Sequence, residues 1–383
     1  MNIVADSAIP FISRIFNSSG NTVLLDTHEI TRSNIKNADV LVVRSVTCVN
    51  EALLAGTEIK IVACPASGID HIDLTYLHSV GIKLINTPGC NARSVAEYVL
   101  SSLFSLQKKQ YIKLADIKIG LIGCGHVGSY VFSLLDAIGI KVLLYDPPLQ
   151  AAGDSRKFST LHEIQKADVI SLHVPLNSTG ANSTYQLVNH DFLSAIKPGA
   201  VIINTSRGEV IDDKALLDFL EYNHGSNVVI DVWKDEPVIN QELLSRAILS
   251  TPHIAGYSID AKYRGTLWVY EKLCEMLGIE KCVPAEDIIP ALKENQFNIP
   301  EVLDDNEVIQ FAVLSGYDVE ADSDVFKQLL TKNEMIPGQF FSELRRHYPL
   351  RREFTYFTVS LPPSKIRCKK RLEDLGFNVM LTN

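Results

Sequence analysis

The chain has 383 residues, a formal net charge of −9, and 46% hydrophobic and 21% charged residues. A chain of this length exceeds a single ordinary core, so we expect two or three domains. The composition is typical of a soluble globular protein, and the acidic balance disfavours a nucleic-acid surface, which would need a basic face. A local arginine cluster could still bind an anionic small molecule, whatever the net charge.

The seven cysteines are dispersed and form no C-x-x-C pair. An odd, scattered set in a long chain is typical of reduced thiols in a reducing compartment. The N-terminus lacks the basic and apolar regions of a signal peptide, and no apolar run reaches the ~18 residues that span a bilayer. We therefore expect a cytoplasmic protein with no membrane segment, and we expect no metal site.

In the first hundred residues, short β-forming runs alternate with amphipathic stretches. The strand-like runs are 2–5, 22–25, 40–43, 59–63 and 83–85, and helical patterns such as 49–54 lie between them. Such alternation favours a parallel α/β sheet. Next, Asn91 can cap a helix that runs to about Lys109 and carries its apolar side chains on one face. This helix fits a packing role, and its place between two α/β patterns also fits an interdomain crossing.

A second α/β pattern begins at residue 117. Its expected strands are 117–122, 141–145, 169–173, 200–204 and 228–232, and its clearest helices are 127–138 and 255–277. The last helix could return the chain to the first unit. The pattern predicts an α/β protein with two Rossmann- or flavodoxin-like parallel-sheet lobes.

Beyond residue 284 the composition changes, because acidic residues and helix breakers become frequent. We expect a strand over 354–361, a helix over 365–375 capped by Ser364, and a final strand over 377–381. These elements predict a separate small α/β module over 285–383.

A glycine-rich loop, GCGHVG at residues 123–128, stands between a strand pattern and a helix pattern. In this context the first two glycines let the backbone turn and approach a pyrophosphate, and the third lets the helix pack closely on the strand. Backbone amides at the helix N-terminus would face the phosphates. The candidate cofactor contacts in the loop are Gly123, Gly125, His126, Val127 and Gly128.

Asp146 lies 18 residues after Gly128, at the end of the next predicted strand, which is the spacing of a Rossmann unit. Its carboxylate would accept hydrogen bonds from the adenosine ribose and would repel a 2′-phosphate. Residues 147–150 include no arginine that could bind that phosphate. The loop therefore favours NAD over NADP. A glycine-rich turn followed by a surface aspartate is the alternative, and the flanking strand and helix patterns disfavour it.

Three charged residues follow β-forming runs farther along the chain: Arg207, Glu236 and His253. The carboxyl ends of parallel strands meet at one edge of a sheet, where doubly wound folds bind ligands. A neutral His253 can take a hydroxyl proton while the hydride leaves, and Glu236 can orient the ring and stabilise the imidazolium. Arg207 can bind a carboxylate through its planar fork. Each has an ordinary structural explanation alone, but together behind the glycine loop they indicate oxidation of an α-hydroxy acid.

At this point residues 1 to about 280 resemble the D-isomer-specific 2-hydroxyacid dehydrogenases. The resemblance rests on the glycine loop and on HVPL at 173–176, KPG at 197–199, NTSRG at 204–208, DVWKDEP at 231–237 and PH at 252–253. It implies a two-lobed subunit in which Arg207, Glu236 and His253 are catalytic. It also implies NAD contacts outside the loop at Asp146, Pro175, Thr205, Ser206, Arg207, Asp231 and Gly256.

Within that family the chain is most similar to the branch that oxidises 4-phospho-D-erythronate in pyridoxal 5′-phosphate synthesis. The discriminating stretches are VRSVT at 43–47, PGCNA at 88–92, YDPP at 145–148 and HIAGY at 253–257. This resemblance implies a substrate-binding lobe at 1–100 completed by 257–284, an NAD-binding domain at 101–256 and a dimerisation domain at 285–383. The expected partners are a small phosphorylated hydroxy acid and a second copy of the chain.

The resemblance implies substrate contacts at Ser45, Tyr257 and the turn formed by Ala66, Ser67 and Gly68. Ala66 departs from the threonine usual in this branch, so a hydroxyl contact is missing or has moved to Ser67. Backbone amides of the turn could still hold an anionic group.

A substrate with a carboxylate and a phosphate needs more cations than Arg207. Arg44 and Arg264 are the candidates, although Arg44 ends a predicted strand and could instead pair with a local carboxylate. Arg93 is a weaker candidate, because it also fits a solvated helix position. In the tail, Arg345, Arg346, Arg351 and Arg352 form a basic cluster that we expect to be a solvated or interface surface, with a contribution to the partner's pocket as the alternative.

Two other functions stay open. A 3-phosphoglycerate dehydrogenase, or another D-2-hydroxyacid dehydrogenase, shares the VRS segment, but such enzymes usually read GAST after the catalytic His-Leu, where this chain has Ile254 to Ser258. The βαβ pattern of the tail keeps a regulatory domain of that kind open. An NAD-sensing binding protein, like the corepressors built on this fold, could retain the same charged residues.

Overall fold

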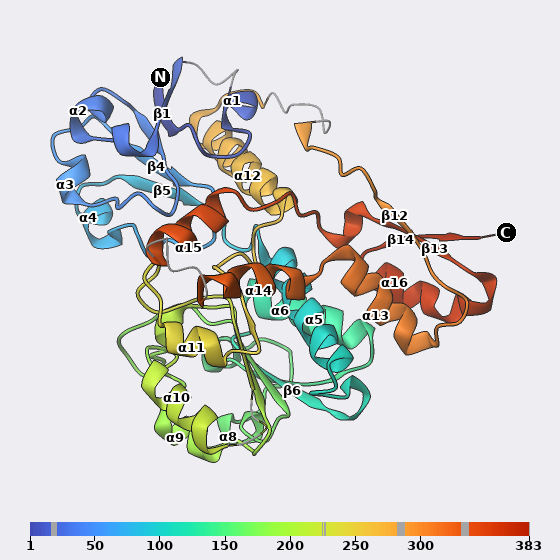
Figure 1. Ribbon diagram of the computed structural model, residues 1–383. Coiled ribbons are helices and arrows are strands. Elements are labelled where there is room, and N and C mark those ends of the chain that lie inside the picture. Colours follow the sequence, from blue (N-terminus) through green and yellow to red (C-terminus); the bar gives the residue numbers. More distant parts are fainter. Residues whose placement is uncertain (17–20, 224, 226, 282–287, 331–336, 383) are drawn as a thin grey trace. The chain divides into compact units, whose positions relative to one another are not determined.

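The computed structural model describes residues 1–16, 21–223, 225, 227–281, 288–330 and 337–382. The chain forms two compact units, residues 1–91 with 258–292 and residues 92–257 with 293–383. Each unit is built on parallel β-sheet (Figure 1). The predicted α/β class, with two parallel-sheet lobes and a small C-terminal sheet, is confirmed. None of the described helices is long and apolar enough to cross a membrane.

The first unit contains a five-stranded parallel sheet in the order β2-β1-β3-β4-β5. Its strands are β1 (Asn2–Asp6), β2 (Asn21–Leu25), β3 (Val40–Val42), β4 (Ile61–Cys64) and β5 (Lys83–Asn86). Its helices are α1 (Ile12–Ile15), α2 (Arg32–Ile35), α3 (Glu51–Leu54), α4 (Leu74–Ser79) and α12 (Ile259–Leu277). All five strands were predicted from their apolar runs to within two residues at each end.

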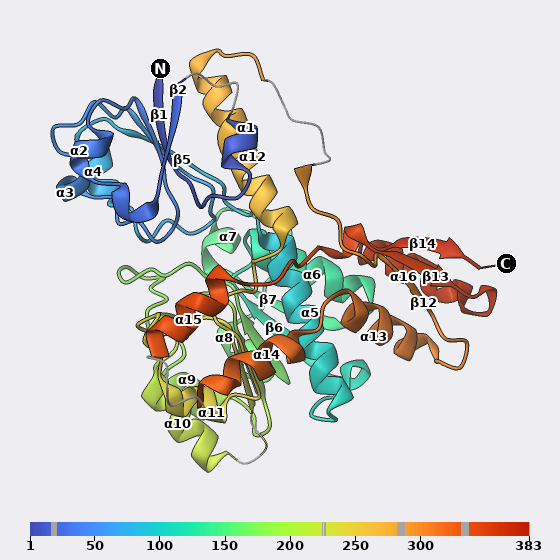
Figure 2. The same cartoon turned by 45° about the horizontal axis from the view of Figure 1, so that its top comes forward.

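Alternating side chains of these strands supply the cores on the two faces of the sheet. Ile3 and Ala5 pack against α1 and α12, whereas Val4 packs toward α2, α3 and α4. This separation follows from the two-residue period of a strand. Figures 1 and 2 show α12 and α1 on one face and the short helices on the other.

The second unit contains a six-stranded parallel sheet in the order β11-β10-β9-β8-β6-β7. Its strands are β6 (Lys118–Ile122), β7 (Lys141–Tyr145), β8 (Val169–Leu172), β9 (Val201–Asn204), β10 (Asn227–Ile230) and β11 (Leu249–Ser250). The helices within this part of the chain are α5 (Ala92–Lys108), α6 (His126–Ala137), α7 (Pro147–Ala151), α8 (Leu161–Ile164), α9 (His190–Ala195), α10 (Asp213–Tyr222) and α11 (Gln241–Arg246). The strand order reverses at β6, so a ligand crevice is expected at the carboxyl ends of β6 and β8.

Helix α5 is buried along almost its whole length and packs against α6. The sequence predicted its range well, but the expected cap is wrong. The Oδ1 atom of Asn91 is buried and accepts no hydrogen bond from the described residues. Propensity identifies a capping residue type, whereas the orientation of its side chain depends on local packing.

The C-terminal part forms a three-stranded parallel sheet in the order β12-β13-β14. Its elements are β12 (Gln296–Asn298), α13 (Asp305–Gly316), α14 (Val319–Lys327), α15 (Pro337–Arg346), β13 (Thr358–Leu361), α16 (Lys369–Asp374) and β14 (Asn378–Leu381). The strand expected from 354 begins only at Thr358, because Phe354–Tyr356 form a 3-10 turn. Ser364 caps no helix, because it lies inside the 3-10 segment Pro363–Cys368 that precedes α16.

The C-terminal segment shares a hydrophobic core with the six-stranded sheet. Phe326 and Phe341 pack in one cluster with Trp233, next to the α9–α11 side of that sheet. This packing explains why residues 293–383 group with 92–257, whereas the sequence suggested a separate module. The expected start of that module at residue 285 lies outside the described residues.

Candidate active site

The three glycines of the loop have different surroundings. Gly123 has φ +90°, and a Cβ there would lie 2.7 Å from the carbonyl carbon of His173. A Cβ on Gly128 would collide with the carbonyl oxygen of Gly123, so this position joins α6 closely to the loop. A Cβ on Gly125 would meet open space. A side chain at Gly123 or Gly128 would therefore clash with the protein itself, whereas the open space next to Gly125 can take a ligand.

The N-terminus of α6 and the carboxylate of Asp146 complete this cradle. Gly125 is the N-cap of α6 and no side chain caps the helix, so its first amides can face an anion. Asp146 accepts hydrogen bonds from the amide of Cys124 at 2.8 Å and of Leu149 at 3.0 Å. The carboxylate thus fixes the loop against the end of β7. These features fit a dinucleotide with its pyrophosphate at α6 and its ribose at Asp146.

Arg156 is a cation near this cradle that the sequence reasoning missed. Its guanidinium binds the carboxylate of Asp154 through two hydrogen bonds of 2.7 and 2.8 Å and donates to Ser129 Oγ at 2.8 Å. The hydrogen bonds from Arg156 lower the pKa of Asp154 to about 2, so the pair is ionised. Because Asp154 neutralises it, Arg156 is a poor receptor for a 2′-phosphate.

Glu236 and His253 form a hydrogen-bonded pair, with 2.7 Å between Oε2 and Nδ1. The other carboxylate oxygen accepts from the amide of Trp233 at 2.8 Å. Burial raises the pKa of Glu236, but the charge of His253 and these hydrogen bonds outweigh it, so the pKa is lowered overall. An ionised Glu236 selects the tautomer with the proton on Nδ1, which leaves Nε2 as the base.

Asp231 holds the turn that carries the histidine. It is 1% exposed, and its carboxylate accepts from the amides of Ile254 at 2.7 Å and Ala255 at 3.0 Å and from Thr251 Oγ1 at 2.7 Å. Burial raises its pKa. His253 itself has φ +58°, a conformation that a non-glycine residue keeps only when its surroundings enforce it. The bonds to Asp231 supply that constraint.

Arg207 lies on a turn that contacts the Glu236 loop directly. Asn204 holds this turn, since its Nδ2 donates to the carbonyl of Arg207 at 2.9 Å. The next residue, Gly208, lies so close to the Trp233 carbonyl that a Cβ would collide with it. The strands β9, β10 and β11 are neighbours, so the turns that follow them share one edge. The structure therefore brings the turns of Arg207, Glu236 and His253 together, as the spacing predicted.

His173 is a second histidine at this edge, present in the HVPL motif but not predicted as a site residue. Its ring lies 3.0 Å from Ser171 Oγ and 3.2 Å from Thr205 Oγ1. Burial lowers its pKa to about 3, so the ring is neutral. The backbone carbonyl of His173 packs closely against Gly123, where a Cβ would lie 2.7 Å from it. It links that loop to Thr205.

The expected substrate residues of the first unit lie in loops after its strands. Ser45 is exposed after β3, and Ala66, Ser67 and Gly68 are half-buried after β4. Ser67 Oγ accepts from the amide of Gly89 at 3.2 Å. These roles stay predictions.

The candidate cations for a second anionic group have local partners. Arg44 forms a 3.0 Å ion pair with buried Asp6, which is the alternative that its position at a strand end allowed. Arg264 donates to the carbonyl of Cys90 at 2.5 Å. Arg93 pairs with Glu97 at 2.9 Å.

The basic cluster of the tail is not a uniformly solvated surface. Arg351 is 6% exposed and donates to the carbonyls of Ala255 at 3.0 Å and Ser94 at 2.6 Å. The expectation of a solvated or interface surface is therefore wrong for this arginine, because its buried guanidinium donates hydrogen bonds to carbonyls on α5 and on the turn after His253. Arg346, in contrast, is 68% exposed and pairs with Glu343.

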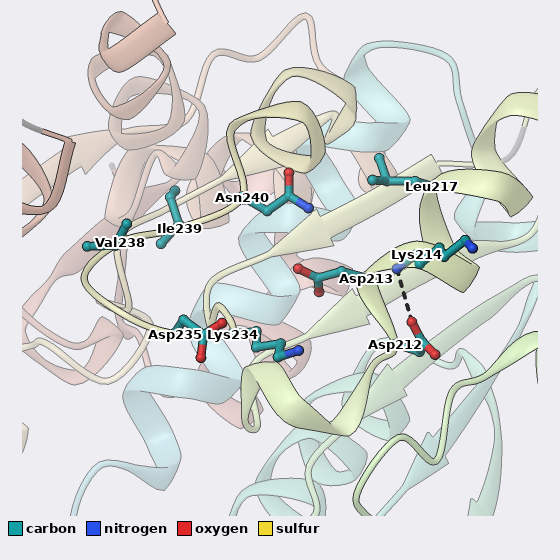
Figure 3. A pocket seen from close by; sticks show the side chains of 9 residues that line it. All are labelled: Asp212, Asp213, Lys214, Leu217, Lys234, Asp235, Val238, Ile239 and Asn240. Atoms are coloured by element: carbon teal, nitrogen blue, oxygen red, sulfur yellow. Dashed lines mark hydrogen bonds between the residues drawn. The ribbon is translucent and has the colours of Figure 1, made fainter.

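A surface hollow lies next to the loop that carries Glu236. It is lined by residues 212–214, 217, 234, 235 and 238–240. Figure 3 shows Lys234 and Asp235 near Asp213, with the Asp212 carboxylate accepting from the amide of Lys214. Neither Arg207 nor the Glu236–His253 pair lines this hollow. It therefore does not form the reaction site.

Comparisons with known proteins identify the family of the chain. Residues 91–255 match the family model of the D-isomer specific 2-hydroxyacid dehydrogenase, NAD binding domain, and residues 288–376 match a domain of unknown function. Erythronate-4-phosphate dehydrogenase of Psychromonas ingrahamii is 38% identical over 100% of this chain and 98% of its own. The enzyme of that name from Hahella chejuensis is 38% identical over 99% of both chains.

Solved dehydrogenase structures share the fold over a smaller part of the chain. NAD⁺-bound 3-phosphoglycerate dehydrogenase of Entamoeba histolytica is 26% identical, covers 73% of this chain and 95% of its own, and has a TM-score of 0.62. D-Lactate dehydrogenase of Aquifex aeolicus, complexed with NAD and lactic acid, is 25% identical over 73% and 96%, with a TM-score of 0.58. The chain therefore belongs to the D-isomer specific 2-hydroxyacid dehydrogenases, and within them to the erythronate-4-phosphate dehydrogenase family of NAD-dependent oxidoreductases.

Proposed function

We propose that the protein oxidises 4-phospho-D-erythronate to (R)-3-hydroxy-2-oxo-4-phosphooxybutanoate with NAD⁺, a step of pyridoxal 5′-phosphate synthesis. The observation that carries the reaction type is the 2.7 Å pair of Glu236 and His253, on loops in contact with the turn of Arg207. The erythronate-4-phosphate dehydrogenases match the whole chain, including the tail, whereas the 3-phosphoglycerate dehydrogenase covers only 73% of it. This difference favours the four-carbon substrate.

In the proposed reaction, Arg207 binds the substrate carboxylate through paired hydrogen bonds and orients the adjacent C2 hydroxyl. His253 Nε2 removes the hydroxyl proton as the C2–H bond breaks and the C=O bond forms. NAD⁺ held by the glycine loop and α6 would supply the acceptor for the hydride that leaves C2. Glu236 keeps the imidazole in the reactive tautomer and stabilises its positive charge after proton transfer.

The glycine loop and α6 would hold the pyrophosphate, and Asp146 would bind the adenosine ribose. On the nicotinamide side we propose contacts from Pro175, Thr205, Ser206, Arg207, Asp231 and Gly256. Thr184 Oγ1 donates to the carbonyl of Pro175 at 2.6 Å, which steadies that segment. The bonds of Asp231 to the catalytic turn support a role in placing His253 as well.

For the substrate we keep Ser45, Ser67, Gly68 and Tyr257 as proposed contacts, together with Ala66 as a position without a hydroxyl. Arg44 and Arg264 are weaker proposals, because each already has a local partner.

A substrate panel tests this function. Purified protein with NAD⁺ should show a higher kcat/KM for 4-phospho-D-erythronate than for 3-phosphoglycerate, and the reverse preference would overturn the substrate. The Arg207→Ala variant should still bind NAD but lose turnover. An unchanged rate in that variant would favour a sensing protein over an enzyme.

We also propose a homodimer through residues 285–383 in a reducing, cytoplasmic setting. The exposed Met380 and Leu381 on β14 support an interface there, and the thiols of Cys48, Cys64, Cys124, Cys274 and Cys368 are free, which fits a reducing compartment. Light scattering at micromolar concentration should give twice the 42.5 kDa chain mass. A monomer would refute the dimer.

A further inference from the structure

The proposed substrate carries two anionic groups, but the cations expected for the second one are engaged elsewhere. Arg207 serves the carboxylate at the reacting end. Arg44, Arg264 and Arg93 bind Asp6, the Cys90 carbonyl and Glu97, respectively. The question of which residue binds the phosphate rests on the proposed function.

Arg345, near the end of α15, is a cation beside the catalytic loops. Its guanidinium carbon lies 5.3 Å from the centre of the Tyr257 ring and 5.8 Å from that of Phe341. Its Nε is buried and has no hydrogen-bond partner among the described residues. A buried, unused N–H on a charged group is costly to the protein alone, so its retention points to an acceptor that arrives with a ligand.

The charge of Arg345 affects the pKa of the Glu236 carboxylate. Burial raises the pKa of Glu236, whereas the charge of His253, the hydrogen bonds and finally the charge of Arg345 lower it. Arg345 and Glu236 form no hydrogen bond or ion pair, so the guanidinium is near the site without being neutralised by that carboxylate.

Packing fixes the position of α15 at both ends. At its start, a Cβ on Gly338 would lie 3.5 Å from Pro237, the residue after Glu236. Just beyond its end, the ring of Tyr348 packs on that of Tyr257 with centres 6.0 Å apart. The hydroxyl of Tyr348 donates to Asp322 at 2.7 Å, which anchors this contact in the C-terminal part.

We propose that Arg345 binds the substrate phosphate in the same subunit, so that the C-terminal segment completes the active site and supplies selectivity for phosphorylated acids. Tyr257 then presents its ring to the arginine side chain and keeps the guanidinium facing the site. The aromatic face holds the cation without using its N–H donors, which remain available for phosphate oxygens.

The decisive variant is Arg345→Met, which preserves the apolar stem and removes the charge. Arg346→Met is the matched control, because Arg346 is the next residue along the chain. Its side chain is 68% exposed and pairs with Glu343. For both variants and the wild type, kcat and KM are measured with 4-phospho-D-erythronate and D-erythronate, and with 3-phosphoglycerate and D-glycerate. Circular dichroism and NAD binding confirm that each variant is folded.

Arg345→Met should lower kcat/KM for the phosphorylated acid about 10- to 100-fold, mainly through KM, as expected for a lost charge-assisted contact. The rate with the unphosphorylated partner of each pair should stay the same, Arg345→Lys should recover part of the loss, and Arg346→Met should match the wild type. Equal losses for phosphorylated and unphosphorylated acids, or no loss, would overturn the proposal.

The measurements on the two pairs of acids distinguish a failure of the Arg345 proposal from a failure of the proposed function. If the wild type prefers 3-phosphoglycerate, the substrate assignment fails, but the ratio of 3-phosphoglycerate to D-glycerate still tests Arg345. If the wild type oxidises neither phosphorylated acid, the proposed function fails. Calorimetric titration of the NADH-bound protein with inorganic phosphate then decides, because Arg345→Met must weaken that binding for the assignment to stand.

Discussion

Replacing Glu236 with glutamine should slow the reaction. The glutamine side chain keeps the size of glutamate but removes the charge that lies 2.7 Å from His253 Nδ1. Its amide can also donate to Nδ1, which would place the ring proton on Nε2 and disable the base. Because general-base catalysis contributes about 10²–10⁴-fold, we expect kcat to fall within that range.

The strength of the lost bond gives a lower bound for the loss of rate. A hydrogen bond to a charged group is worth about 1.5–3 kcal/mol, and about 1.4 kcal/mol corresponds to a tenfold change in rate. The imidazole side chain is 36% exposed, so solvent screening favours the lower end of that range. The lost bond alone should therefore lower kcat about tenfold, and the altered tautomer adds to this loss.

Steady-state kcat and KM with 4-phospho-D-erythronate check this expectation, with NAD binding followed by intrinsic fluorescence. The control is Glu242→Gln, which removes an exposed carboxylate from the first turn of α11. A Glu236→Gln enzyme with the wild-type kcat would refute the role of this pair. If this variant no longer binds NAD, Glu236→Asp replaces it in the comparison, and its kcat should also fall because the shorter side chain weakens the 2.7 Å bond to His253.

Three further outcomes follow from the structure. Gly128→Ala should lower the melting temperature, because the added Cβ collides with Gly123, whereas Gly125→Ala should keep the fold and weaken NAD binding, as melting curves and calorimetry would show. Asp146→Ala should reduce the preference for NAD over NADP in kcat/KM, because it removes the carboxylate that opposes a 2′-phosphate. Burial raises the pKa of Glu97 to about 8, from an ordinary value of 4.5, so its contribution to stability is present below about pH 4.5 and is lost as pH rises toward 8. Glu97→Gln should flatten this loss, which melting curves at pH 5 and pH 8 would reveal.

The sequence predicted the sheets and the reaction edge because both depend on local patterns. Buried parallel strands read as continuous apolar runs, and Arg207, Glu236 and His253 each follow such a run. The order of strands then brings the turns of these residues together without further information. Asp146 was found in the same way, from its distance to the glycine loop.

The sequence did not predict the features that depend on distant side chains. Helices α13, α14 and α15 were not predicted, and the packing of the C-terminal helices within the second unit shows only in contacts such as that of Phe326 with Trp233. The burial of Arg351 depends on carbonyls that are far away in the chain. For Arg44, both an ion pair and a substrate contact were compatible with its strand end, and only the position of Asp6 shows that it is paired. His173 was overlooked as a site residue because its partner Thr205 follows a different strand.

The transfer of the C2 hydride is the most direct measurement of the proposed reaction. The purified protein is incubated with NAD⁺ and 4-phospho-D-erythronate that carries deuterium at C2, and the reduced cofactor is analysed by mass spectrometry. We predict NADH that is one mass unit heavier, formed together with the 2-oxo acid and absent with the Arg207→Ala variant. Unlabelled NADH, or label transfer only from deuterated 3-phosphoglycerate, would contradict this account.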